Sequence, residues 1–211
     1  MKILIDNGHG ADGYTKGKYS PIVDGMSIEH DATIFGHRFR EGNFNRLVAD
    51  ELARQLNQLG YDAELIVTEQ QDVSLSERVR RVNERCKQIG AKNALFISIH
   101  ANAAGNGEQW QSARGFSVHV ASQSSKASKR FAAIMTDNAV SMGLQGNRSI
   151  PKEKYWQNDF YVIRKTVCPA VLTENLFYDN KDDLGIIATP SGRERIVKLH
   201  IDSITKYIKC L

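Results

Sequence analysis

The chain has 211 residues, of which 41% are hydrophobic and 25% are charged, and its formal net charge is +4. This composition is typical of a globular protein, and it excludes a disordered chain and a membrane span of ~20 apolar residues. The length fits a single domain over residues 1–211, and the small positive charge without a basic helix argues against nucleic acid as a partner.

Apolar runs typical of β-strands alternate along the chain with segments of helical period. This alternation predicts a three-layer α/β domain, in which helices flank a central sheet. The β-type runs span residues 2–6, 63–68, 94–100, 115–121, 160–164 and 170–174.

The segments between these runs repeat apolar residues at three- and four-residue steps and are predicted to be α-helices. Ser74 and Glu77 form a capping-box pattern at the start of the second helix. Glycines directly follow the first three segments and are placed to end them. The helices are expected over residues 43–59, 74–89, 124–142 and from Pro190 onward.

Two polar stretches show no clear period, namely residues 11–40 and residues 143–159. Long irregular segments in a compact domain are often binding loops. The first stretch is interpreted as a polar insertion that leaves directly from His9, and it is the expected source of this chain's own specificity.

The N-terminus enters a β-type run at once, so we expect no signal peptide, and the route of export stays open. Cys86, Cys168 and Cys210 lie far apart without metal-type spacing, which favours free thiols, with Cys86 in the core. A thiol hydrolase that uses Cys168 is a weak alternative, because Pro169 follows directly and no histidine stands beside it.

Two histidines, His9 and His100, stand at or just past the end of an apolar run. Ligands gather at strand ends in open α/β sheets, so two imidazoles delivered there could converge on one metal ion. Either histidine alone is more often an ordinary residue satisfied by backbone hydrogen bonds. A catalytic zinc site needs a further ligand, and Glu41, just before the first helix, is preferred to Glu29 in the middle of the insertion.

A second carboxylate, Glu174, ends the last apolar run, which would deliver it to the same rim of the sheet. A buried carboxylate beside a metal site could serve as general base and then as general acid. A turn or helix cap is an equally weighted alternative. The other histidines, His30, His37, His119 and His200, have no metal-type context and are interpreted as surface or loop residues.

A series of short segments follows a fixed order across nearly the whole chain: residues 5–10, Glu41 with Asn45, Val48, Ala49 and Leu52, residues 96–102, 115–116, 147–148 with Ile150, 160–164, and 169–174 with Phe177, Asn180 and Asp183. In this order the chain resembles the zinc-dependent N-acetylmuramoyl-L-alanine amidases of the Amidase_3 type, which include bacterial cell-wall amidases and phage endolysins. Asn7, Thr173 and the long insertion depart from the family pattern, which leaves the substrate preference open.

The resemblance implies that His9, Glu41 and His100 bind one zinc ion and that Glu174 is the catalytic acid/base. It also implies a single α/β domain with a mixed, mainly parallel central sheet, similar to zinc exopeptidases. The substrate would be peptidoglycan or a muropeptide, cut between N-acetylmuramic acid and L-alanine at the cell wall or outside the cell. We expect a monomer without membrane insertion.

Two further residues are candidates for substrate contacts. Asn102 follows His100 closely enough to orient it or to meet a substrate amide, and Arg164, at a predicted strand end, could bind a carboxylate. A turn asparagine and a surface arginine are equally good interpretations. A zinc peptidase in which Arg164 grips a free C-terminus and an inactive wall-binding module also stay open.

Overall fold

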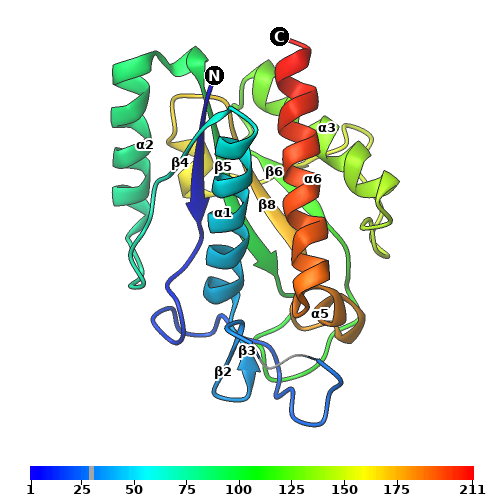
Figure 1. Ribbon diagram of the computed structural model, residues 1–211. Helices are drawn as coiled ribbons and strands as arrows, with labels where there is room; N and C mark the ends of the chain where they lie inside the picture. Colours follow the sequence, from blue (N-terminus) through cyan, green and yellow to red (C-terminus); the bar gives the residue numbers. More distant parts are fainter. Residues whose placement is uncertain (29–30) are drawn as a thin grey trace.

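A six-stranded sheet in the order β4-β1-β5-β8-β6-β7 forms the centre of the protein (Figure 1). The computed structural model describes residues 1–28 and 31–211, so that Glu29 and His30 lie outside the described residues. The strands are β1 (Lys2–Asn7), β4 (Asp62–Leu65), β5 (Ala94–Asn102), β6 (Ser117–Val120), β7 (Trp156–Gln157) and β8 (Ala170–Phe177).

The sheet is mixed and mainly parallel, which confirms the prediction. Strands β4, β1, β5 and β8 run parallel to one another, whereas β6 is antiparallel to β8. Parallel pairing brings the carboxyl ends of adjacent strands to the same edge. Because Asn7 pairs with Ile99, the chain leaving β1 passes beside His100 at the end of β5.

Helices cover both faces of the sheet. One face carries α1 (Glu41–Gln58), α3 (Lys126–Ser141) and α6 (Pro190–Lys209), and the other carries α2 (Leu75–Ile89) and α4 (Tyr161–Arg164) (Figure 1). Side chains alternate between the faces along β1, so Ile3 packs in the α1 layer and Leu4 in the α2 layer. A short helix, α5 (Lys181–Ile187), follows β8. Within the described part of the chain, no helix combines the length and the apolarity that crossing a bilayer requires.

Helix α1 begins at Glu41, two residues before the expected start near Asn43. The first helical hydrogen bond runs from the Phe44 N–H to the Arg40 carbonyl oxygen, which places Glu41 in the first turn. A carboxylate is favourable there because the amino end of a helix is positive. Glu41 is therefore held by the helix itself and not by the loop that precedes it.

The prediction of a strand over residues 160–164 is wrong, because this segment forms α4. The N–H groups of Arg164 and Lys165 donate to the carbonyl oxygens of Phe160 and Tyr161 at 2.9 and 3.0 Å. The adjacent residues Val162 and Ile163 are both buried in the α2 layer, whereas a strand would send them to opposite faces. Five residues are too few to distinguish the apolar period of a strand from that of a helix.

The insertion lies beyond the carboxyl end of β1 and contains a hairpin of β2 (Ile34–Phe35) and β3 (Arg38–Phe39) (Figure 1). Two apolar side chains of this otherwise polar segment, Val23 and Phe39, are fully buried in the main core. The Phe39 ring stacks on Tyr178 with a centroid distance of 6.2 Å. The insertion is thus anchored to the domain beside the strand ends.

The cysteines are free thiols, as predicted, and Cys86 lies in the core of the α2 layer. Cys168 is also buried, and burial raises the pKa of its thiol. A raised pKa opposes the thiolate that a cysteine nucleophile needs. The structure therefore gives no support to a thiol hydrolase that uses Cys168.

His119 in β6 and His200 in α6 are buried, so the prediction that they are surface or loop residues is wrong. His200 falls four residues after Ile196 and four before Ile204, which puts it on the buried face of α6. Its Nδ1 lies 2.8 Å from the Ile196 carbonyl oxygen and its Nε2 lies 3.2 Å from Thr173 Oγ1. His37 is exposed, as expected.

Burial lowers the pKa of His200 to about 4, so the folded protein holds this side chain neutral. The unfolded chain, with a histidine pKa of ~6.5, takes up the proton first as the pH falls. The free energy of unfolding of the metal-free protein should therefore decrease between about pH 6.5 and pH 4, with His200 contributing at most ~1.4 kcal/mol per pH unit. In urea unfolding at several pH values, His200→Gln should flatten this slope, and an unchanged slope would contradict the assignment.

Candidate metal and catalytic site

His9, Glu41 and His100 converge at the carboxyl ends of β1 and β5, where the amino end of α1 meets the sheet. Glu41 Oε1 lies 3.4 Å from His9 Nε2 and 3.0 Å from His100 Nδ1. The two imidazole rings are nearly perpendicular, at 88°, with their centroids 4.8 Å apart. One ligand atom from each of the three residues lies within 4.8 Å of the others.

These residues fit one tetrahedral metal ion. Ligands placed ~2.1 Å from zinc in tetrahedral geometry are separated by about 3.4 Å, close to the two spacings from Glu41, and all three ligand atoms lie within 4.8 Å of one another. Glu41 Oε2 is buried and accepts no hydrogen bond from the described residues, so it has a free coordination position. Two histidines and one carboxylate form a common donor set for catalytic zinc.

The protonation of the ligands agrees with this fit. Burial opposes the charge on Glu41, but the neighbouring His9 and His100 outweigh it and lower the pKa of the carboxyl group. Burial lowers the pKa of His100, although its contact with Glu41 acts in the opposite direction. A carboxylate and a neutral imidazole are the forms that bind a metal ion.

Two glycines allow the ligands to come together. A Cβ on Gly8 would lie 2.0 Å from His100 Cε1, and a Cβ on Gly42 would lie 1.9 Å from the Gly10 carbonyl oxygen. Because Gly8 has no Cβ, the His100 ring can pack against the chain that carries His9. Because Gly42 has no Cβ, the first turn of α1, with Glu41, can approach the same segment.

Gly8→Ala is therefore expected to displace the His100 ring and to remove most of the bound metal, because the new Cβ would occupy the ring's position. Gly13→Ala is a matched control in the same segment, since a Cβ there would meet no heavy atom within 4 Å. Metal content per chain, measured by elemental analysis after dialysis, checks the prediction. Equal metal content in the two variants would contradict it.

Glu174 lies beside the three ligands, because β8 pairs with β5 and aligns Glu174 with His100. Its Oε2 is buried and has no hydrogen-bond partner among the described residues. Burial raises the pKa of Glu174 well above its usual value, and the charge of Glu41 raises it further. A carboxyl group in this setting can exchange a proton instead of remaining a permanent anion.

Two cationic side chains that were not among the predicted site residues, Lys18 and Arg148, oppose this rise in the pKa of Glu174. Lys18, in the insertion, has its Nζ 3.8 Å from Glu41 Oε2. The Arg148 guanidinium lies over the Phe177 ring, 4.7 Å from its centroid. Arg148 belongs to one of the segments that carry the family resemblance, whereas nothing distinguishes Lys18 from the other lysines in the sequence.

The candidate substrate residues have different positions. Asn102 ends β5 near His100, but its Oδ1 accepts a hydrogen bond of 2.9 Å from the Ala103 N–H within its own turn. Arg164 is exposed at the end of α4 and lines a pocket with Pro169 and Ala170 at the start of β8. Ala170 is the first residue of β8 and lies four residues before Glu174, so the structure does not place Arg164 among the site residues.

A pocket of about 400 Å³ adjoins the two histidines on the α2 side of the sheet. Its walls combine polar groups, including Thr15 and Asp72, with the apolar side chains of Leu75 and Val162. Of the four candidate site residues, the two histidines line this pocket. Its lining residues are Asp6, Gly8, His9, Thr15, Asp72, Val73, Ser74, Leu75, Arg78, His100 and Val162.

Comparison with known proteins finds a family whose profile matches nearly the whole chain. The profile of the Amidase_3 family, described as N-acetylmuramoyl-L-alanine amidase, matches residues 3–206. An endolysin of Bacillus phage SPP1 is 28% identical over 152 residues, which cover 70% of this chain and 51% of the endolysin. The chain thus spans about half the length of that relative.

Solved structures share the fold. The catalytic domain of CwlV, an N-acetylmuramoyl-L-alanine amidase from Bacillus (Paenibacillus) polymyxa var. colistinus, superposes with a TM-score of 0.72 at 24% identity, covering 99% of this chain and 98% of that one. The N-acetylmuramyl-L-alanine amidase Ami1 from Mycobacterium smegmatis gives a TM-score of 0.77 at 20% identity, covering 100% and 98%. At these identities the likeness establishes the common architecture.

Proposed function

Because the chain belongs to the Amidase_3 family of N-acetylmuramoyl-L-alanine amidases, we propose that it hydrolyses the amide bond between N-acetylmuramic acid and L-alanine in peptidoglycan. The convergence of His9, Glu41 and His100 within 4.8 Å, with Glu174 beside them, is the observation that carries the proposal. The substrate then defines the place of action as the cell wall. All four residues come from one chain, so the activity needs no second copy.

His9, Glu41 and His100 would hold one zinc ion per chain and leave a further coordination position open for a substrate or water oxygen. When bound, the ion would supply Lewis acidity, which polarises a carbonyl group and makes water acidic near pH 7. The buried Oε2 of Glu41, which accepts no hydrogen bond from the described residues, supports this assignment. The neutral imidazole that burial favours at His100 supports it as well.

Glu174 would act as the general base and then as the general acid. As a carboxylate it accepts a proton from the attacking water, and as a carboxylic acid it returns that proton to the nitrogen of the leaving L-alanine. The opposing influences on its pKa suit this exchange: burial and Glu41 favour the acid, whereas Lys18 and Arg148 favour the carboxylate. Its alignment with His100 supports a position next to the scissile bond.

Product analysis of digested peptidoglycan tests the proposed function. The expected products are stem peptides with a new amino terminus on L-alanine, and glycan strands without new reducing ends. Removal of amino acids from unrelated peptides would indicate a zinc peptidase instead. Binding to the wall without any product would indicate an inactive module.

A further inference from the structure

The backbone of His9 adopts a left-handed conformation, with a φ of 67°. Residues other than glycine rarely adopt this conformation, and they keep it only where surrounding contacts hold it. At His9 those contacts are made to the carbonyl oxygen, which accepts hydrogen bonds from Arg46 Nη1 in α1 at 2.9 Å and from Arg78 Nη2 in α2 at 3.3 Å. The peptide that carries one candidate metal ligand is therefore held from two helices.

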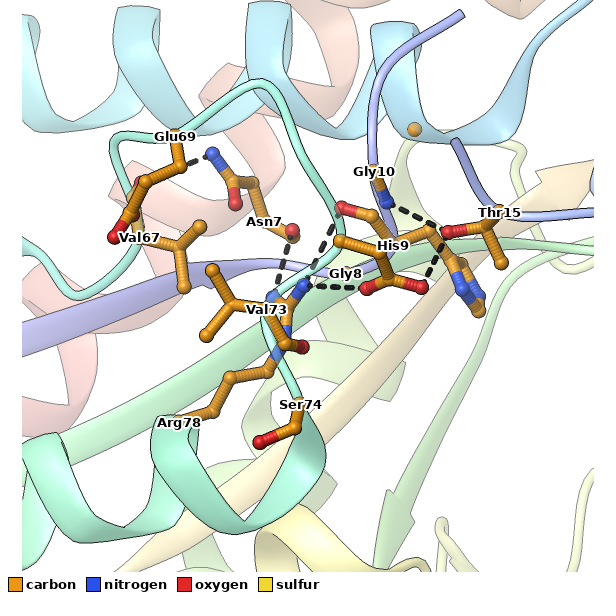
Figure 2. A network of polar contacts seen from close by, with 12 residues as sticks. Asn7, Gly8, His9, Gly10, Thr15, Val67, Glu69, Val73, Ser74 and Arg78 are labelled. Carbon is orange, nitrogen blue, oxygen red and sulfur yellow. Dashed lines mark hydrogen bonds and ion pairs between the residues drawn. The ribbon is translucent and has the colours of Figure 1, made fainter. Parts of the chain in front are cut away.

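Arg78 is 1% exposed and makes the larger set of contacts (Figure 2). A guanidinium offers five N–H donors in a fixed plane, and each donor of Arg78 faces an acceptor. Nε donates to the Val73 carbonyl oxygen, Nη1 to Asp6 Oδ1 and the Asn7 carbonyl oxygen, and Nη2 to the His9 carbonyl oxygen and Asp72 Oδ1.

These contacts enclose Gly8, whose missing Cβ makes room for the His100 ring. Arg78 binds the carbonyl oxygens of Asn7 and His9, the residues on either side of Gly8. It thereby fixes the segment that carries one histidine and against which the other histidine packs.

The same guanidinium is linked to the strand that carries His100. Asp6 Oδ2 accepts a hydrogen bond of 2.6 Å from Ser98 Oγ in β5, two residues before His100. On the other side, Asp72 Oδ2 accepts one of 2.6 Å from Thr15 Oγ1, which in turn accepts the Gly10 N–H at 2.8 Å. One buried side chain thus connects β1, β5 and the start of the insertion.

We propose that Arg78 is a positioning residue for the metal site, which fixes the left-handed His9 peptide and so aims His9 Nε2 at Glu41 and His100. This inference rests on the proposed function, because it concerns the same metal site. Arg46 assists from α1, but none of its hydrogen bonds goes to Asp6 or Asn7. A purely structural ion pair between Arg78 and Asp6 would stabilise the fold without setting the affinity for metal.

The test compares metal binding by the full chain carrying Arg78→Lys with that of the wild type, without substrate. Lysine keeps the charge but cannot reproduce the planar set of donors. We expect the dissociation constants for Zn²⁺ and Co²⁺, measured by chelator competition, to rise roughly 10–100-fold. The absorption bands of bound Co²⁺ should also change, since they report ligand geometry.

Arg80→Lys is the matched control, because Arg80 lies on the same helix but is exposed and, among the described residues, forms ion pairs only with the half-buried Glu77 and Glu84. Should Arg78→Lys fail to fold by circular dichroism, Arg46→Lys removes the other donor to the His9 carbonyl oxygen and leaves the Arg78 contacts intact. It should also weaken metal binding and change the Co²⁺ spectrum.

Unchanged dissociation constants and an unchanged Co²⁺ spectrum in the folded variants would overturn the inference, even if the variants unfolded more easily. The metal affinity of the wild type distinguishes a failure of the positioning role of Arg78 from a failure of the proposed function. A wild type that bound neither ion would overturn the metal site, and the positioning role of Arg78 with it.

Discussion

Replacing Glu174 by glutamine is expected to lower the turnover of peptidoglycan by roughly 10²–10⁴-fold, the usual contribution of general acid–base catalysis, while the zinc content stays unchanged. Glutamine has the same shape as glutamate but cannot take up and return a proton. The three metal ligands come from other residues, so they remain in place. Initial rates on purified peptidoglycan and elemental analysis of the same sample give the two quantities.

Glu153→Gln is the control for this experiment, because Glu153 is exposed in the segment before β7. It removes the same charge from the protein and should leave turnover unchanged. If Glu174→Gln hydrolysed peptidoglycan at the wild-type rate, Glu174 would not be the acid/base. Loss of zinc together with turnover would make Glu174 a residue of the metal site instead of the acid/base.

Replacing His9 by alanine is expected to remove both the bound zinc and the activity. The site then keeps one histidine and one carboxylate, whereas zinc held by proteins ordinarily has at least three protein ligands. The pair of readouts distinguishes this variant from Glu174→Gln, in which metal is retained and only turnover falls. Zinc content after dialysis and the rate of peptidoglycan hydrolysis are the measurements.

The control for His9→Ala is His37→Ala, since His37 is exposed in the insertion and 2.9 Å from the exposed Asp24. This control should bind one zinc ion and hydrolyse peptidoglycan like the wild type. A His9→Ala protein that retained stoichiometric zinc would show that the metal lies elsewhere. An active, zinc-free His9→Ala protein would remove the metal from the mechanism.

The strand ends that carry His9 and His100 could be predicted because two long apolar runs belong to buried parallel strands. Once those strands are neighbours, the topology of the sheet brings the residues at their ends together. The location of Glu41 could be predicted because it stands at the start of a helix that returns to the same edge. Local sequence pattern and chain direction were sufficient to bring the three residues to one edge of the sheet, whereas their role as zinc ligands is what the family resemblance implies.

The helix α4 and the buried histidines were missed for a different reason. Residues 160–164 are rich in β-branched and aromatic residues, and only packing against α2 decides that they form a helical turn. His200 has the polarity of a surface residue, but the apolar residues around it on α6 bury it. Tertiary contacts override local preference in both cases.

The positions of Lys18, Arg78 and Arg148 also depend on contacts between distant segments. Arg78 stands in a helix whose other arginines form exposed or half-buried ion pairs, and its burial follows from Asp6, 72 residues earlier in the chain. Lys18 reaches Glu41 because the Glu41 N–H donates to the Lys18 carbonyl oxygen. A single sequence does not reveal such pairings.

Titration of the chelator-treated wild-type protein with zinc tests the central claim most directly. The account predicts that the metal-free protein releases no L-alanine amino termini from peptidoglycan. It also predicts that this activity rises with added zinc and reaches its plateau at one equivalent per chain. Full activity after verified removal of the metal, or no recovery on adding zinc to the folded protein, would contradict the proposed zinc site.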